Sequence, residues 1–277
     1  MEGCVPDSRL CLNMSTLDSV DLETQLRLAR EAGFTAVGLR EKHVEAFLER
    51  GGTLRDVRRL LDLNRLTAVE YNYFPNWTCA GSDAQAILRR FAAFCEAARA
   101  LGCSIVVAPT GCETGDAYPD CQAAVSALRG MAGVADEYGL TVGVEFLPWT
   151  PCNSVGRAWE LVRSAGRANV GIVLDAFHFF EGPSTETELR QVPDQAICLV
   201  HVNDVEEVDA GLIARCREHR VLPGDGIYPL PRFLSQVREH QYEGYYSLEA
   251  MSTGCAAREP AELAKASFAS MRRLLGG

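Results

Sequence analysis

The chain has 277 residues, of which 47% are hydrophobic, and a formal net charge of −10. A chain of this size can bury a full core as one large domain or two small ones. The acidic balance argues against a nucleic-acid partner, because binding to a phosphate backbone needs clustered lysine and arginine. No stretch approaches the roughly 20 apolar residues of a membrane helix, so we expect no membrane partner.

The eleven cysteines are odd in number, include no C-x-x-C pair and lie mostly in apolar stretches. This usage is typical of reduced core residues in a reducing compartment rather than of a disulfide framework. The first residues, Met1–Asp7, show neither the basic nor the apolar segment of a secretion signal. We therefore expect a cytoplasmic protein.

Short apolar runs alternate with longer amphipathic segments eight times along the chain. The expected strands are Leu10–Thr16, Ala36–Arg40, Leu66–Tyr73, Ser104–Thr110, Thr141–Phe146, Val170–His178, Ile197–Asp204 and Tyr245–Met251. The expected helices are Leu22–Ala32, Leu54–Leu63, Asp83–Leu101, Gln122–Tyr138, Ser154–Ala165, Leu230–His240 and Pro260–Leu275. Several of these helices end at a glycine, which favours the left-handed conformation of a helix C-cap.

This alternation predicts an α/β fold with parallel strands and right-handed crossovers. Eight units in about 250 residues match a (β/α)8 TIM barrel. An open doubly wound sheet is the alternative, but no Gly-x-Gly-x-x-Gly motif follows the first strand. Because the sequence shows no linker or shift in composition, we expect a single TIM-barrel domain over residues 1–277.

Four expected strands end in a residue that can bind a metal. Glu145 lies in VGVEF, Asp175 lies in LDAFH, His201 begins HVND and Glu249 ends SLE. The carboxyl ends of barrel strands meet at the catalytic mouth, so these side chains would share one part of its rim. A buried carboxylate needs compensation, and one shared divalent cation is the simplest source. Pairing of each carboxylate with a buried arginine is the alternative.

Three carboxylates and one imidazole suit Mn²⁺, Mg²⁺ or Co²⁺, with Zn²⁺ as a further candidate. A cation with open positions would polarise a substrate carbonyl and stabilise the enediolate that forms when a neighbouring carbon loses its proton. A carboxylate on each face of the substrate would act as base and acid, giving isomerisation or epimerisation. Loss of a β-hydroxyl would give dehydration instead, and the ligand set alone does not separate these outcomes.

The same motifs, together with PGDG at Pro223–Gly226, carry a resemblance over essentially the whole chain. The sequence resembles the xylose isomerase-like barrels of sugar phosphate isomerases and epimerases, and is similar in length and motif order to inosose isomerases, ketose 3-epimerases and hydroxypyruvate isomerases. The resemblance implies an isomerase or epimerase of carbohydrate metabolism, acting on a small polyhydroxy ketone such as a ketose or inosose. It implies that one metal is held by Glu145, Asp175, His201 and Glu249.

The resemblance further implies that Glu145 and Glu249 are the catalytic pair, facing each other across the substrate. It also implies a homodimer or homotetramer, between which the sequence does not decide. We find no glycine-rich phosphate loop beyond PGDG, so the sequence does not require a phosphorylated substrate.

Four further residues are predicted to contact the substrate. They are His178, Arg220, Asn13 and Trp77. Three have alternatives: a capping histidine hydrogen-bonded to a loop carbonyl, a solvated arginine, and plain aromatic packing for Trp77. Asn13 is a polar residue inside an apolar run and is expected to hydrogen-bond the substrate. Asp225 is expected to form a turn, and Glu41 and His43 are expected in a surface loop.

Two other functions remain open. A lyase of the 3-dehydroshikimate dehydratase kind would use the same metal, and its substrate carboxylate would require Arg40, Arg157 or Arg220 at the mouth. A non-catalytic metal-binding barrel is the alternative of another class, and would have no open coordination position. A metal-dependent DNA-repair nuclease is disfavoured, because the chain has only five histidines and is acidic.

Overall fold

The computed structural model describes residues 4–78, 83–111 and 121–276, except for the side chain of residue 121. A closed barrel of parallel strands forms its centre, in the order β1-β10-β7-β6-β5-β4-β3-β2. The barrel strands are β1 (Leu10–Asn13), β2 (Ala36–Arg40), β3 (Thr67–Asn72), β4 (Ile105–Pro109), β5 (Thr141–Glu145), β6 (Val170–Asp175), β7 (Ile197–Val202) and β10 (Tyr246–Leu248). The predicted TIM barrel is confirmed.

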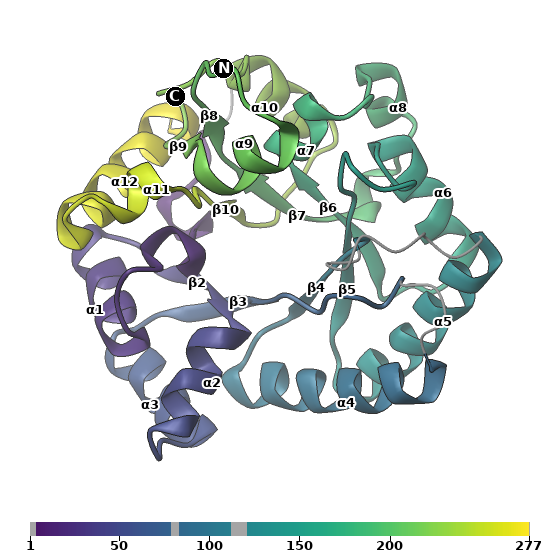
Figure 1. Cartoon of the computed structure of the whole chain (residues 1–277), viewed down its shortest axis with the longest axis horizontal. Coiled ribbons are helices and arrows are strands. Elements are labelled where there is room, and N and C mark those ends of the chain that lie inside the picture. Colours follow the sequence, from purple (N-terminus) through teal and green to yellow (C-terminus); the bar gives the residue numbers. More distant parts are fainter. Residues whose placement is uncertain (1–3, 79–82, 112–120, 277) are drawn as a thin grey trace.

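Helices form a ring around these strands (Figure 1). The outer helices are α1 (Leu22–Ala32), α3 (Leu54–Leu63), α4 (Ala84–Leu101), α5 (Cys121–Glu137), α6 (Val155–Ala165), α10 (Leu230–Glu239) and α12 (Pro260–Leu275). Their ends follow from local chemistry. In α1, for example, the Asp21 carboxylate accepts a hydrogen bond from the Thr24 backbone N–H at 3.0 Å, and Gly33 ends the helix with φ of +114°.

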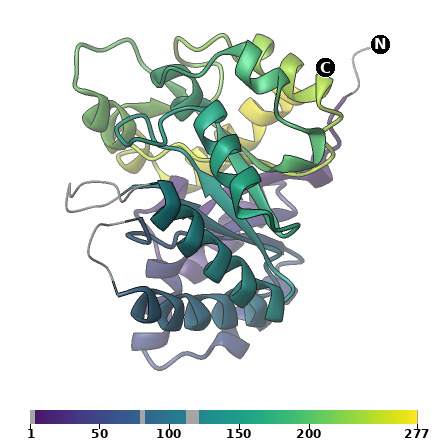
Figure 2. The ribbon, with the colours of Figure 1, turned by 90° about the vertical axis from the view of Figure 1, so that its right-hand side faces the viewer.

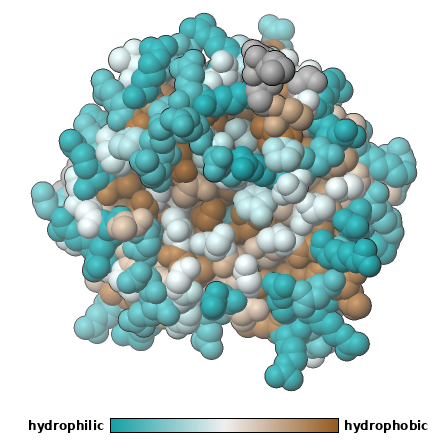
Figure 3. Space-filling view, turned by 180° about the vertical axis from the view of Figure 1, so that it is seen from behind, coloured by the Kyte–Doolittle hydropathy of each residue, from teal (hydrophilic) through white to brown (hydrophobic). Residues whose placement is uncertain are grey.

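Shorter elements precede the first strand or lie between the strands and these helices. They are α2 (Glu41–Glu49), α7 (Ala176–Glu181), α8 (Glu186–Arg190), α9 (Leu212–Glu218), α11 (Thr253–Ala256), the 3₁₀ turns Asp7–Arg9, Met14–Leu17 and Asp194–Ala196, and the antiparallel pair β8 (Asp204–Val205) and β9 (Arg220–Val221). The side view shows the blue helices of the first half of the chain in the lower part and the green and yellow helices of the last third in the upper part (Figure 2). On the face behind the view of Figure 1, hydrophilic side chains surround a middle region where apolar side chains reach the surface (Figure 3).

Seven of the eight expected strands end one to three residues earlier than the sequence indicated, and local chemistry accounts for three of these ends. Val170–His178 stops at Asp175, because the Asp175 carboxylate accepts the backbone N–H of His178 at 3.1 Å and so begins α7. Leu10–Thr16 stops at Asn13, whose side chain caps the next turn. The run from Ile197 breaks after Val202, and Asp204 belongs instead to the β8–β9 hairpin.

The expectation of a surface loop at Glu41 and His43 was wrong, because both residues lie in α2. Arg50 is the C-cap residue of this helix. The helix contacts β2, the strand that it follows. In the described part of the chain no helix is both long and apolar enough to cross a membrane.

Strand register brings the ends of β5, β6, β7 and β10 together. Glu145 on β5 pairs with Val173 on β6, and Asp175 on β6 pairs with His201 on β7. His201 also pairs with Ser247 on β10, two residues before Glu249. Parallel neighbours in register therefore place the predicted ligands side by side at one end of the barrel.

Candidate metal centre

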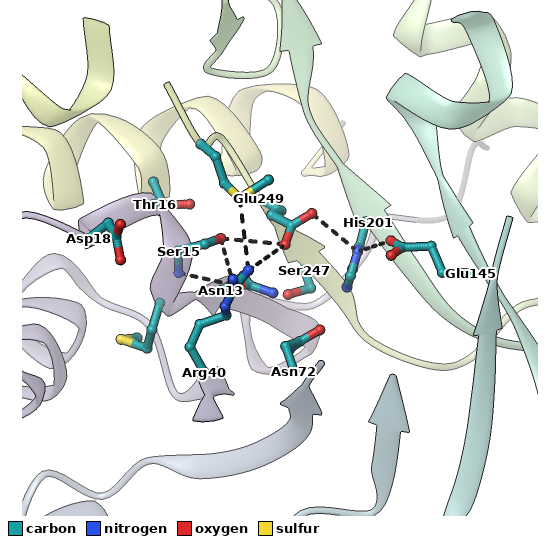
Figure 4. Close-up of polar contacts among 12 residues, drawn as sticks. Asn13, Ser15, Thr16, Asp18, Arg40, Asn72, Glu145, His201, Ser247 and Glu249 are labelled. Atoms are coloured by element: carbon teal, nitrogen blue, oxygen red, sulfur yellow. Dashed lines mark hydrogen bonds and ion pairs between the residues drawn. The ribbon is translucent and has the colours of Figure 1, made fainter. Parts of the chain in front are cut away.

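Glu145, Asp175, His201 and Glu249 form one cluster. Each offers a ligand atom, and these atoms all lie within 4.8 Å of one another. The Nδ1 atom of His201 lies 3.3 Å from Glu145 Oε1, 3.7 Å from Asp175 Oδ2 and 3.6 Å from Glu249 Oε2. Glu145 and Glu249 lie on opposite sides of the imidazole (Figure 4). The four side chains that the sequence placed near strand ends therefore meet at one point of the barrel.

The polar atoms of this cluster fit a divalent cation. All four residues are buried, and three of them are carboxylates. Among the described residues, Glu145 Oε1 and His201 Nδ1 have no hydrogen-bond partner, although both are buried. Unsatisfied buried acceptors are costly unless something binds them. A cation among these atoms satisfies both, and the oxygen-rich set with one imidazole suits a hard or borderline metal.

Arg220 supplies the main positive charge beside the cluster. Its Nη1 donates to Glu249 Oε2 at 3.0 Å and to Asp175 Oδ2 at 3.3 Å, and the residue is 1% exposed. Burial would raise the pKa of Asp175, but the Arg220 guanidinium and the two nearby histidines outweigh burial and lower it. Burial raises the pKa of Glu249. The two carboxylates therefore differ in their readiness to take up a proton.

A pocket opens over the cluster at the mouth of the barrel. Glu145, Glu249, His178 and Arg220 contribute to its lining. Its other walls are mostly apolar or aromatic and come from several strand ends, namely Tyr73, Pro75, Pro109, Leu147, Trp149 and Met251. A concave apolar site with a few convergent polar groups is the usual form of a small-molecule site.

Comparisons with known proteins agree with the barrel fold. Residues 26–274 match the family model described as a xylose isomerase-like TIM barrel. The chain belongs to this family. An inosose isomerase of Halalkalibacterium halodurans is 29% identical over 249 residues, which are 87% of each chain. A 3-dehydroshikimate dehydratase of Pseudomonas aeruginosa is 29% identical over 235 residues, which are 84% of this chain and 36% of the dehydratase.

A solved structure shows the same fold. The crystal structure of an IOLI protein with a binding zinc atom has a TM-score of 0.89 against this chain, at 23% identity, and the alignment covers 96% of this chain and 98% of IOLI. The likeness of the two barrels extends over nearly their whole length.

Two of the predicted substrate contacts of this xylose isomerase-like barrel line the pocket. His178 places Nε2 3.9 Å from Glu145 Oε1 and stands edge-on to Trp149, with ring centroids 5.5 Å apart. Burial lowers the pKa of His178, which favours a neutral imidazole. Arg220 also lines the pocket, but its described hydrogen bonds go to Asp175, Glu249 and Cys216.

The structure places the other two predicted contacts outside the pocket lining. The Asn13 side chain accepts from Ser15 N at 3.0 Å and donates to Glu70 Oε1 at 3.4 Å. Trp77 is buried in the core, where its Nε1 donates to the Pro109 carbonyl at 2.8 Å. A buried indole needs such an acceptor, and the Pro109 carbonyl supplies it.

The sequence did not predict two acidic residues of the site. Glu70 lies in the middle of β3, and its Oε2 lies 2.8 Å from His201 Nε2. Asp204 is fully buried and accepts four backbone N–H groups, those of Val205, Gly224, Gly226 and Tyr228. A charged residue inside a buried run was the available signal in both cases. Asp225 itself is exposed and pairs with Arg273 at 3.4 Å.

Proposed function

We propose that the protein is a divalent-metal-dependent isomerase or epimerase of a small polyhydroxy ketone, either a ketose or an inosose. The observation that carries this proposal is the placement of Glu145 and Glu249. Both carboxylates line one pocket, and they flank the Nδ1 atom of His201 from opposite sides (Figure 4). Similarity to an inosose isomerase over 87% of the chain supports the same reaction class.

We propose that Glu145, Asp175, His201 and Glu249 hold one ion of Mn²⁺, Mg²⁺, Co²⁺ or Zn²⁺. The donor chemistry suits these ions, and the zinc in the similar IOLI barrel adds weight to Zn²⁺. When bound, the ion supplies a Lewis acid that polarises the substrate carbonyl and stabilises negative charge on adjacent oxygens.

The residues of the chain carry the proton transfers. One carboxylate of the Glu145–Glu249 pair takes the proton from the carbon beside the carbonyl, and the other holds a proton for delivery at the opposite face. His178, kept neutral by burial, donates a hydrogen bond to a substrate hydroxyl. The apolar walls around Leu147 and Trp149 hold the carbon skeleton of the substrate beside the two carboxylates.

Isotope exchange tests this assignment. The protein is purified without chelator and incubated in D2O with ketoses and inososes, and deuterium beside the carbonyl is followed by NMR. Glu145→Gln and Glu249→Gln should each lower the exchange rate about 10²- to 10⁴-fold, because each removes one acid–base group. Glu239→Gln, an exposed substitution on α10, serves as the control. Full exchange in both pocket variants would contradict the proposal.

Arg40 favours a second candidate, a dehydratase of the 3-dehydroshikimate type. This arginine lines the pocket, its side chain is 10% exposed, and its Nη1 lies 3.8 Å from both Glu249 Oε1 and Met251 Sδ. Its guanidinium also stacks on the Tyr73 ring, 4.7 Å from the centroid. These long contacts leave Arg40 able to bind a substrate carboxylate. Arg157, by contrast, is exposed and pairs with Glu160 on α6.

A substitution pair separates the two candidates. Arg40→Met should raise KM for a carboxylate-bearing substrate about 10- to 100-fold, because a charge-assisted hydrogen bond is lost, and should affect a neutral inosose less. Arg157→Met is the matched surface control. Loss of water from dehydroshikimate without deuterium in recovered substrate would favour the dehydratase, whereas exchange into an inosose alone would exclude it.

A further inference from the structure

Glu70 is a fully buried carboxylate directly behind the candidate metal centre. It lies in β3, across the barrel from β7, and is 0% exposed. Its Oε2 lies 2.8 Å from His201 Nε2. Its Oε1 accepts hydrogen bonds from Ser247 Oγ at 2.5 Å and from Asn13 Nδ2 at 3.4 Å. Three strands thus contribute side chains to one carboxylate that is not among the four candidate ligands.

The sequence makes room for this carboxylate at Gly38 on β2. A Cβ atom at position 38 would overlap the Glu70 side chain, with Glu70 Cγ and Cδ each 2.8 Å away. Glycine in the middle of a strand weakens the strand and marks a close approach. A buried charge is also costly without partners. Two local features that destabilise the fold, a glycine inside β2 and a buried charge, therefore accompany the contact of Glu70 with His201.

The two ring nitrogens of His201 face different surroundings. Nδ1 points at Glu145, Asp175 and Glu249, the three carboxylates of the cluster. Those acids attract a proton to Nδ1, where it would block a cation. Glu70 lies on the other side, with Oε2 2.8 Å from Nε2. Because an ionised carboxylate only accepts, this hydrogen bond requires the proton to be on Nε2. A carboxylate at this position selects the tautomer that leaves the Nδ1 lone pair free.

We propose that Glu70 is a positioning residue for the metal centre: it fixes the orientation and tautomer of His201 so that Nδ1 binds the cation, and Gly38 gives it the necessary space. This inference rests on the metal site of the proposed function. Carboxylates behind metal-binding histidines typically raise metal affinity by 10- to 100-fold. The same range is expected here.

Competition titrations with Zn²⁺ and a chromophoric chelator test the proposal. Glu70→Gln keeps the side-chain shape but removes the charge, and should raise the Kd for Zn²⁺ about 10- to 100-fold. Ser247→Ala is the matched control, because it removes one hydrogen bond to Glu70 and leaves the His201 contact, and should change Kd less than about 3-fold. The proposal is overturned if Glu70→Gln, folded by circular dichroism, binds Zn²⁺ as tightly as the wild type.

A second variant and a spectroscopic measurement guard against a merely structural effect. Gly38→Ala displaces the Glu70 carboxylate without altering a candidate ligand, so its loss of Zn²⁺ affinity should not add to that of Glu70→Gln.

In long-range ¹H–¹⁵N spectra of the Zn²⁺-loaded wild type, His201 should show a protonated Nε2 and a Zn²⁺-bound Nδ1. A protonated Nδ1 would overturn the proposal. Absence of Zn²⁺ binding in the wild type would overturn the metal centre and this inference together, whereas equal binding by wild type and Glu70→Gln overturns the inference alone.

Discussion

Glu41 is an acidic residue at the start of α2 whose proton equilibrium depends on folding. Burial, followed by repulsion from Glu45, raises its pKa from 4.5 to about 7. An acid whose pKa is higher in the folded state stabilises that state while it is protonated. Its stabilising effect is therefore complete below about pH 4.5 and is lost as the pH rises to about 7.

Substitution of Glu41 should change the pH dependence of stability. Glu41→Gln removes the titrating group, so the melting temperature should fall less between pH 4.5 and pH 7 than in the wild type. Thermal unfolding at a series of pH values measures this slope, with Glu239→Gln as an exposed control. Parallel slopes for wild type and Glu41→Gln would show that Glu41 titrates alike in both states.

At the residue scale, the sequence predicted four candidate ligands, which the structure brings together, but it did not predict the residues that support them. Glu145, Asp175 and His201 were readable because each stands at the end of an apolar strand, where barrel geometry alone brings strand ends together. Glu70 lies inside β3, and its role follows only from its contact with His201, 131 residues later in the chain. Such a contact follows from barrel closure and side-chain direction, which a strand pattern does not encode.

At the element scale, the β8–β9 hairpin places Arg220 beside the cluster. Asp204 on β8 binds the backbone of the loop that follows β9. The Asp204 carboxylate accepts the backbone N–H groups of Gly224 and Gly226 at 3.1 Å and of Tyr228 at 2.9 Å. Arg220 lies on β9, beside Val205 on β8. The order of this loop and the placement of the arginine are therefore linked.

Asp204→Ala should lower the free energy of unfolding by about 3 kcal/mol, because several hydrogen bonds to a buried charge are lost. It should also raise KM, since Arg220 lies in the same hairpin. Asp225→Ala is the matched control in the same loop. Its exposed pair with Arg273 predicts less than about 1 kcal/mol. Urea unfolding and steady-state kinetics measure both effects, and equal losses in the two variants would contradict the role of Asp204.

The long elements were predicted well because their periodicity and caps are local. The bounds of α1, α3 and α12 agree with the sequence prediction. The short helices α7, α9 and α11 were missed, since each has seven residues or fewer and depends on tertiary packing. In α7, the cap is Asp175 itself, a residue that the sequence assigned to a strand and a ligand set.

At the scale of the whole molecule, the buried acidic cluster should link metal binding to folding. A ligand that binds only the folded state stabilises it by about 2.7 kcal/mol at 100 times its Kd. For a chain of this size we expect the melting temperature to rise by about 5 °C or more with saturating Zn²⁺ or Mn²⁺. Calorimetry after chelator treatment and re-addition of metal measures the shift, and Glu249→Gln should reduce it. An unchanged melting temperature would contradict this linkage.

The most direct test of the account joins metal content to proton transfer in a single preparation. Protein purified without chelator is assayed for bound metal and then incubated with an inosose in D2O. We predict one divalent ion per chain and deuterium beside the substrate carbonyl, with the deuterium lost in Glu249→Gln. A folded protein that holds no metal and exchanges no proton with any ketose, inosose or dehydroshikimate would contradict the account and leave a barrel without this catalytic function.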